Sequence, residues 1–184
     1  MTLKETNKVL NSFAKHVVKE SKLNLVKDKK GGGALYKSID YDLDDEGNAF
    51  LLDFLMENYG TFQDLGVRGK DPSALPKEAK WYGVQKGKNS PFKFGSMKSR
   101  GLKKAINKWT IKKNLKGIRD KKTGRFLPRK TMQYLITRSI YLAGIKPSMF
   151  FTRPFNKAFS QLPDNLVNAF ALDVEKNLVL GIKK

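Results

Sequence analysis

Positive charge is concentrated in the middle third of this chain. Residues 61–130 carry 21 Lys and Arg against 4 Asp and Glu, whereas residues 1–60 carry 9 against 10 and residues 131–184 carry 7 against 3. Like charges repel one another, so such a segment requires a polyanion, an acidic partner surface or solvent around it. A mobile, Lys-rich loop is the simplest interpretation of an isolated lysine run. An excess of +17 within 70 residues is explained equally well by binding to nucleic acid or to an acidic neighbouring subunit.

The composition excludes several kinds of functional site. The 184 residues include no Cys, which rules out disulfides, thiolate zinc sites, iron–sulfur clusters and cysteine nucleophiles. The one histidine, His16, excludes two-histidine metal motifs and leaves a Ser-His-Asp triad a single possible base. The glycine run 31–33 lacks the Walker spacing, and the acidic residues around position 44 do not match an EF-hand loop. We therefore expect no cofactor, no metal and no catalytic residue, and a protein that is not an enzyme.

Membrane association is not expected either. The longest apolar run, 49–56, has the length of a strand and is interrupted by Asp53. The N-terminal segment 3–18 is broken by Lys, Glu and Asn throughout, so it lacks the apolar region of a signal peptide. We expect a soluble protein that is not exported by a classical signal.

The first third of the sequence predicts a helix followed by a β-hairpin. Residues 2–27 place apolar side chains at helical spacing, and Thr2 with Glu5 forms a capping-box pattern. The glycine run 31–33 ends this helix. Residues 34–43 and 49–56 alternate as two strands, joined by an acidic turn at 44–48.

The rest of the sequence predicts a long loop and three helices. Residues 69–98 are rich in Gly, Pro and Lys and contain one short strand candidate, Trp81–Val84. Helices are expected from 99 to about 113, from Pro128 to Gly144, and from about 154 to 180 with a break at Pro163–Asp164. The side chains expected to face inward on the last helix are Ala158, Phe159, Leu162, Leu166, Ala169, Phe170, Val174 and Leu178.

Together these elements predict an α+β fold. A small antiparallel sheet is packed by an N-terminal helix and by C-terminal helices, and a long basic loop and helix are inserted. The length suits a single domain over residues 1–184. Its parts are an N-terminal helical arm (1–30), a β-hairpin and following strand region (34–69), a basic insertion (70–130) and a helical part (128–180).

The basic insertion is a candidate surface for nucleic acid. Lys104, Lys108 and Lys112 form an i, i+4 ridge that can contact phosphates, and Trp81, Tyr82 and Phe126 are candidates for stacking on bases. For Trp109 and Phe126, a place in a core or an interface is the favoured interpretation. Lys exceeds Arg by 30 to 7 and no known nucleic-acid motif is present, which favours diffuse electrostatic contact over base readout. The candidate contact residues are Lys103, Lys104, Lys108, Lys112, Lys113, Lys116, Arg119, Lys121, Lys122 and Arg125.

The order of motifs resembles the tail-completion, or head–tail joining, proteins of tailed bacteriophages. The residues that carry the resemblance are Tyr59 to Gly69, Trp109, Lys116 to Asp120, Gly124 to Phe126, Ile136 to Ile140, Gly144 to Pro147 and Phe150 to Phe155. The resemblance covers residues 35–175 by element order. It implies a small sheet packed by helices, a strand at Tyr59-Gly60, and an aromatic-proline segment that leads into the C-terminal helix. The long basic region 70–130 departs from the family pattern.

The resemblance also implies a function. It suggests a structural virion protein that forms a homo-oligomeric ring of six or twelve copies at the neck or tail top and joins the head or connector to the tail. The implied partners are other neck, connector or tail proteins and double-stranded DNA in the lumen. The implied location is the virion, and the bacterial host cytoplasm during assembly. The candidate interface residues are Asp42, Asp44, Asp45, Glu46, Tyr59, Phe62, Arg68, Phe151, Arg153 and Phe155. The alternative is a sequence-independent nucleic-acid-binding protein that uses residues 98–130 and acts as a monomer or dimer.

Overall fold

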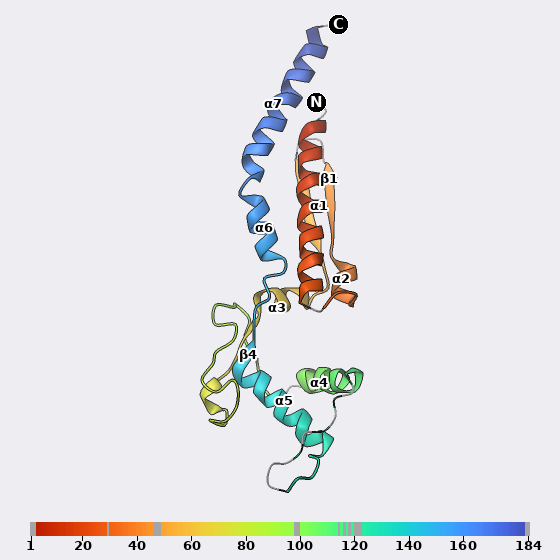
Figure 1. Cartoon of the computed structure of the whole chain (residues 1–184). Coiled ribbons are helices and arrows are strands. Elements are labelled where there is room, and N and C mark those ends of the chain that lie inside the picture. The colour runs from red at the N-terminus through yellow and green to blue at the C-terminus, as the bar shows by residue number, and fades with distance from the viewer. Residues whose placement is uncertain are drawn as a thin grey trace. The chain divides into compact units, whose positions relative to one another are not determined.

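The chain folds into two compact units, described here from a computed structural model (Figure 1). The structure describes residues 3–28, 30–45, 49–97, 100–113, 115, 117, 119 and 123–182. Unit 1 comprises Met1–Asp64 and Ser148–Lys184, and unit 2 comprises Leu65–Pro147. The α+β prediction is confirmed, because helices pack on a small antiparallel sheet and a second two-stranded pair is present.

Unit 1 is built around the long helix α1 (Lys4–Lys27). Its predicted apolar face is buried, including Leu10, Phe13 and Val17. The predicted cap Thr2 lies outside the described residues. The start of the helix is capped from the other end of the chain, where Asp173 of α7 (Leu162–Ile182) accepts hydrogen bonds from the backbone N–H groups of Glu5 and Thr6, both at 2.9 Å. A carboxylate at this position also complements the positive end of the helix dipole.

The hairpin of unit 1 pairs β1 (Asp40–Asp45) with β2 (Phe50–Leu55). Residues 34–38, predicted as part of the first strand, form the short helix α2 (Ala34–Ser38) instead. Leu35 and Ile39 are both buried, and their spacing of four residues fits one helical turn as well as an alternating strand. The Tyr59 hydroxyl accepts a hydrogen bond from the backbone N–H of Leu35 at 3.0 Å, which satisfies a donor that the start of the helix leaves free.

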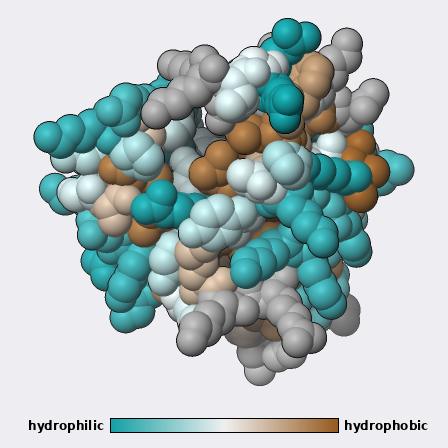
Figure 2. Space-filling view, turned by 90° about the horizontal axis from the view of Figure 1, so that it is seen from below, coloured by the Kyte–Doolittle hydropathy of each residue, from teal (hydrophilic) through white to brown (hydrophobic). Residues whose placement is uncertain are grey.

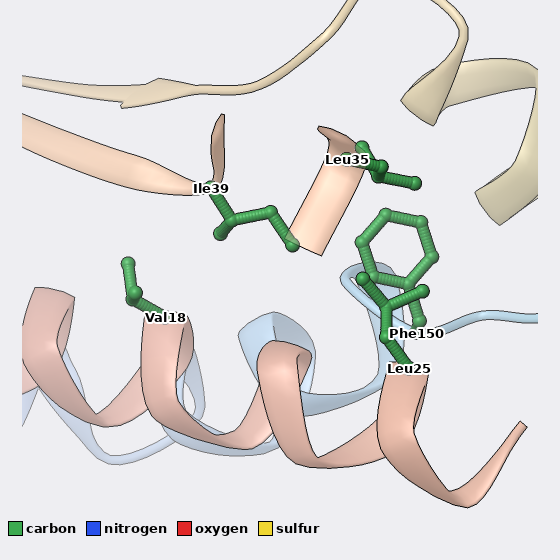
Figure 3. Packing of buried hydrophobic residues seen from close by; sticks show 5 residues of the cluster. All are labelled: Val18, Leu25, Leu35, Ile39 and Phe150. Carbon is green, nitrogen blue, oxygen red and sulfur yellow. The ribbon is translucent and has the colours of Figure 1, made fainter. Parts of the chain in front are cut away.

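The core of unit 1 joins segments that are far apart in the sequence. Figure 3 shows one cluster, in which Val18, Leu25, Leu35, Ile39 and Phe150 converge from α1, from the α2–β1 segment and from the segment before α6 (Thr152–Phe159). A neighbouring cluster is aromatic: Phe13, Phe54, Phe151 and Phe155 pack with ring centroids 5.3 to 6.2 Å apart. Such edge-to-face and stacked pairs stabilise a core beyond the area that they bury.

A second buried carboxylate, Asp64, caps the helix α6 (Thr152–Phe159). Asp64 lies in α3 (Gly60–Leu65) and accepts hydrogen bonds from the backbone N–H of Phe151 at 2.8 Å and of Thr152 at 3.3 Å. The Thr152 hydroxyl also donates to this carboxylate. The resemblance implied a strand at Tyr59-Gly60, and this expectation is wrong because Gly60 begins α3.

The last predicted helix is two helices. The break lies at Ser160–Gln161 between α6 and α7, and Pro163 falls in the first turn of α7, where proline is tolerated. Leu162 and Ala169 are buried as expected. Phe159, Phe170 and Leu178 were expected to face inward, but 49%, 49% and 64% of their surfaces are exposed. The helix carries more apolar residues than one face can bury.

Unit 2 is entered and left through a pair of two-residue strands, β3 (Val67–Arg68) and β4 (Gly144–Ile145). Gly144 also ends α5 (Arg129–Ala143) with a left-handed φ of 91°, as expected for a helix-terminating glycine. The backbone of Gly69 approaches the carbonyl of Leu142 so closely that a Cβ at Gly69 would overlap it. Only glycine fits at this crossing.

The remainder of unit 2 is mostly loop, with one 3₁₀ turn, η1 (Pro72–Ala74), and α4 (Arg100–Lys112), which packs on α5. The strand predicted at Trp81–Val84 is wrong. These residues form turns, in which Val84 N–H donates to the Trp81 carbonyl and Gly83 has a φ of 66°. No described helix is both long and apolar enough to traverse a bilayer.

Candidate functional site

The two units differ completely in net charge. Unit 2 contains 23 Lys and Arg against 3 Asp and Glu, whereas unit 1 contains 14 of each. The whole excess of +20 therefore belongs to unit 2. The ion pairs between described residues, Glu5–Lys8, Glu5–Lys176 and Asp28–Lys30, all lie in unit 1. In the described part of unit 2, no Lys or Arg has a carboxylate within ion-pair distance.

Helix α4 presents the predicted lysine ridge to solvent. Ile106 and Thr110 are buried, and Asn107 accepts a hydrogen bond of 2.6 Å from Gln133 of α5, which fixes the helix on its neighbour. The described basic candidates of this region are all exposed: Lys103, Lys104, Lys108, Lys112, Lys113, Arg119 and Arg125. Lys116, Lys121 and Lys122 lie outside the described residues. The ridge can therefore reach a polyanion without displacing any protein contact.

Aromatic side chains accompany these cations. Trp109 and Phe126 are 45% and 60% exposed, and the Arg119 guanidinium lies 4.8 Å from the centre of the Phe126 ring. Around Trp81 the structure brings together two lysines that were not predicted as site residues, Lys80 and Lys86, whose ammonium groups lie 5.0 and 3.5 Å from the ring centre. Burial lowers the pKa of Lys86, and repulsion from Lys80 lowers it further.

The surface of the molecule is mixed in polarity. On the face drawn in Figure 2, hydrophilic side chains dominate and hydrophobic ones reach the surface among them in separate patches. Exposed apolar side chains occur in both units.

The outer face of the hairpin is acidic. Asp42 and Asp44 alternate with the inward-facing Leu43, so they share the outer face with Asp40. The strand register places Asp53 of β2 directly opposite Asp42. Asp53 was not predicted, and only the register brings it into this set. Like charges opposite one another across a sheet are destabilising, so this face favours a cation from outside.

The other acidic candidates do not join that face. Asp45 is exposed, but the alternation of the strand turns it to the opposite side from Asp44. Glu46 lies outside the described residues. Among the described residues, no group of three or more His, Asp and Glu is arranged to hold a metal ion.

The remaining interface candidates are scattered. Phe151 and Phe155 belong to the aromatic core cluster of unit 1, whereas Arg153 is exposed. Tyr59 uses its hydroxyl within unit 1, but its side chain is half exposed, as is that of Phe62. Arg68 is exposed in unit 2, where its backbone N–H donates to the Phe92 carbonyl at 2.8 Å.

Two further surfaces of unit 1 were not predicted, an apolar helix face and a groove of mixed lining. The first, here the α7 stripe, consists of Val167, Phe170, Val174 and Leu178. The second, here the α1–α7 groove, is an open groove of about 930 Å³ between α1 and the α6–α7 segment. Its lining includes Glu5, Lys8, Ser12, Phe13, His16, Lys157, Leu162, Asn165, Asn168, Ala169 and Leu172. The excess of apolar residues in α7 is the sequence signal from which a second apolar face could have been predicted.

Comparison of the chain with models of protein families, with curated proteins and with solved structures finds no match in any of the three.

Proposed function

We propose that this protein is a structural virion protein that forms a ring at the neck or tail top of a tailed bacteriophage, joining the head or connector to the tail. The proposal rests on the order of motifs that resembles tail-completion proteins and on the charge distribution of the two units. The ring is built from copies of this chain, with neck, connector or tail proteins above and below it. The basic unit 2 contacts the DNA that passes through.

The separation of charge carries the proposal. An acidic outer face on the hairpin and a unit with an excess of +20 lie on the same chain, so each copy can offer one surface and accept the other. A contact between two different surfaces of identical subunits is heterologous, and it forms a ring when the rotation between neighbouring subunits closes. Opposite charges also select the correct orientation of the subunits and speed their encounter.

The test is the mass of nuclease-treated protein by light scattering, at low and at high salt. The proposal expects a closed oligomer whose formation is weakened when the hairpin face is reversed by the triple change Asp42→Lys, Asp44→Lys and Asp53→Lys. A matched control reverses three other carboxylates of unit 1, Glu20, Asp28 and Glu57, with the same change in net charge. Equal assembly of wild type, triple variant and control would contradict the charged contact.

A second candidate function is sequence-independent binding of nucleic acid. The exposed ridge of Lys104, Lys108 and Lys112, with no carboxylate nearby in the described part of unit 2, favours it. Each phosphate contact contributes about 0.9 to the slope of log affinity against log salt. Replacing the three lysines by Ala should therefore lower the slope by about 2 to 3 for duplex DNA. Replacing Lys15, Lys19 and Lys27 of unit 1 should leave it unchanged, and equal slopes for both variants would refute the assignment.

A further inference from the structure

The α7 stripe and the α1–α7 groove lie on opposite sides of the same helix. Groove residues Asn165, Asn168 and Leu172 are each followed two positions later by a stripe residue, Val167, Phe170 and Val174 respectively. Two residues correspond to about 200° around a helix, so each pair points in opposite directions. Figure 1 shows α1 alongside one side of α7, and in this view no described element of unit 1 lies on its far side.

Three of the four stripe residues are exposed, and Val174 between them is half-buried. Val167 is 69% exposed and Leu178 is 64% exposed, and the spacing of the four stripe residues repeats every three or four positions. That spacing is the pattern of a helix that packs against other helices. Asp173 caps α1 near its start, so the segment of α7 after Asp173 continues past the first described turn of α1.

The groove has the dimensions of such a helix. Its α1 wall runs from Glu5 to His16, twelve residues, and its α7 wall from Leu162 to Leu172, eleven residues. The stripe from Val167 to Leu178 spans twelve residues. At 1.5 Å per residue, these spans are about 16 to 18 Å long. The floor of the groove includes the apolar side chains of Phe13, Leu162 and Ala169.

The charges around the two surfaces are complementary. Exposed Asp164 and Glu175 lie three positions from Val167 and Leu178, so they flank the stripe. The groove is lined by exposed Lys157 and by Lys8, which already forms an ion pair of 3.0 Å with the groove residue Glu5, so the excess positive charge of the groove comes from Lys157. Stripe and groove therefore match in length, in apolar character and in charge, and both are present on every copy.

We infer that the occupant of the groove is α7 of a second copy of this chain, which seats its stripe against α1 and α7 of the first. The inference rests on the proposed homo-oligomer and names a second contact within it, beside the charged contact of the hairpin face with unit 2. Because the two surfaces lie on opposite sides of α7, the contact is heterologous, and each added copy exposes a new groove and a new stripe. A stripe-to-stripe contact would stop at a dimer.

The chain has no cysteine, so disulfide trapping can test this geometry directly. We would prepare Ser12→Cys and Asn168→Cys in the groove and Val167→Cys and Val174→Cys in the stripe. Under mild oxidation, mixtures of a groove variant with a stripe variant should form disulfide dimers at least tenfold faster than either variant alone. A double variant with one cysteine in each surface should give a ladder of dimers, trimers and larger species.

The outcomes separate the inference from the proposed ring. Rapid self-linking of the stripe variants alone would show a symmetrical stripe contact and overturn the inference. An oligomer by light scattering in which none of the groove–stripe mixtures cross-link would overturn the inference and leave the ring standing. A monomer at every concentration would overturn the inference, and it would leave the ring to be tested on its partner proteins.

A substitution that introduces a charge into the stripe provides a second test of the inference. Phe170→Glu should raise the concentration needed for half-assembly at least tenfold while the far-UV circular dichroism stays unchanged. Tyr134 of α5 in unit 2 has the same exposure, 49%, so Tyr134→Glu is the matched control and should assemble as wild type does. Equal assembly of both variants would overturn the inference.

Discussion

Removing the carboxylate of Asp64 should unfold unit 1 more easily and leave unit 2 intact. Asp64 is 4% exposed and holds the start of α6 through the backbone N–H groups of Phe151 and Thr152 and through the Thr152 hydroxyl. In Asp64→Ala these donors lose their acceptor where water has little access. Asp64→Asn keeps one acceptor oxygen but loses the charge, and Thr152→Val removes only the hydroxyl bond.

The expected loss in the free energy of unfolding follows from the number and kind of hydrogen bonds that each variant lacks. A hydrogen bond to a charged group contributes about 1.5 to 3 kcal/mol, and a helix cap about 0.5 to 2 kcal/mol. The bonds share one carboxylate, so their contributions do not add fully. We expect a loss of about 3 kcal/mol for Asp64→Ala, about 1.5 kcal/mol for Asp64→Asn and about 1 kcal/mol for Thr152→Val.

The two units can be followed separately by urea denaturation. Both tryptophans, Trp81 and Trp109, lie in unit 2, so their fluorescence reports unit 2, whereas far-UV circular dichroism reports the helices of both units. With a slope of about 1 to 3 kcal/mol per molar urea, Asp64→Ala should lower the midpoint of the unit 1 transition by roughly 1 to 3 M. The fluorescence transition should not move.

One control variant and two possible results test the prediction for Asp64. Asp71→Ala removes an exposed carboxylate of unit 2 that accepts one hydrogen bond, from Ser73 at 3.0 Å, and should change little. If Asp64→Ala is as stable as wild type within about 0.5 kcal/mol, the buried cap does not stabilise α6. If the fluorescence transition shifts as far as the dichroism transition, the two units unfold together and the assignment to unit 1 is wrong.

Three further predictions concern other contacts of the fold. The hydrogen bonds to Asp173 hold its pKa below the ordinary value, so unit 1 should lose stability as pH falls below about 4, and Asp173→Asn should flatten that loss in urea titrations between pH 3 and 7. Gly69→Ala should destabilise unit 2 by about 2 to 3 kcal/mol in the fluorescence transition, because its Cβ would overlap backbone, whereas Gly95→Ala, with nothing within 4 Å, should change it by less than about 0.5 kcal/mol. Leu25→Ala should cost about 3 kcal/mol in the unit 1 transition, because the side chain is fully buried, whereas the half-exposed Leu51→Ala should cost less than about 1 kcal/mol.

Local sequence patterns were sufficient to predict the elements that bury one face against a single neighbouring element. Helix α1 shows its apolar face at helical spacing, and Gly144 marks the end of α5, so both were predictable. The segment 34–38 was mispredicted because Leu35 and Ile39 fit both a strand and a helical turn, and a hydrogen bond to the distant Tyr59 favours the helix. Helix α7 was mispredicted because apolar residues were assumed to face inward, although a helix has room for only one buried stripe here.

The interaction surfaces depend on contacts between residues far apart in the sequence. Asp53 joins the acidic face only because the register of the hairpin sets it opposite Asp42. Lys86 meets Trp81 through a turn that the sequence suggested as a strand, and the backbone N–H of Lys86 donates to the Ala143 carbonyl at 2.8 Å. The groove needs both ends of the chain, because one wall comes from α1 and the other from α7. Charge, in contrast, is additive along the sequence, which is why the basic surface could be predicted before the fold was known.

The charged contact of the acidic hairpin face with unit 2 and the apolar contact of the α7 stripe with the α1–α7 groove respond to salt in opposite ways. Each copy that joins an assembly brings the +20 of its unit 2, so at low ionic strength copies repel one another unless an anion or an acidic face neutralises them. An apolar contact through the α7 stripe is not weakened by salt, because it gains from the burial of hydrophobic surface. If the stripe and groove build the assembly, high salt should therefore favour assembly of the protein alone while it weakens contact with DNA. A ring that forms at high salt and dissociates at low salt would assign the main contact to the stripe and groove, whereas the reverse would assign it to the acidic hairpin face and unit 2.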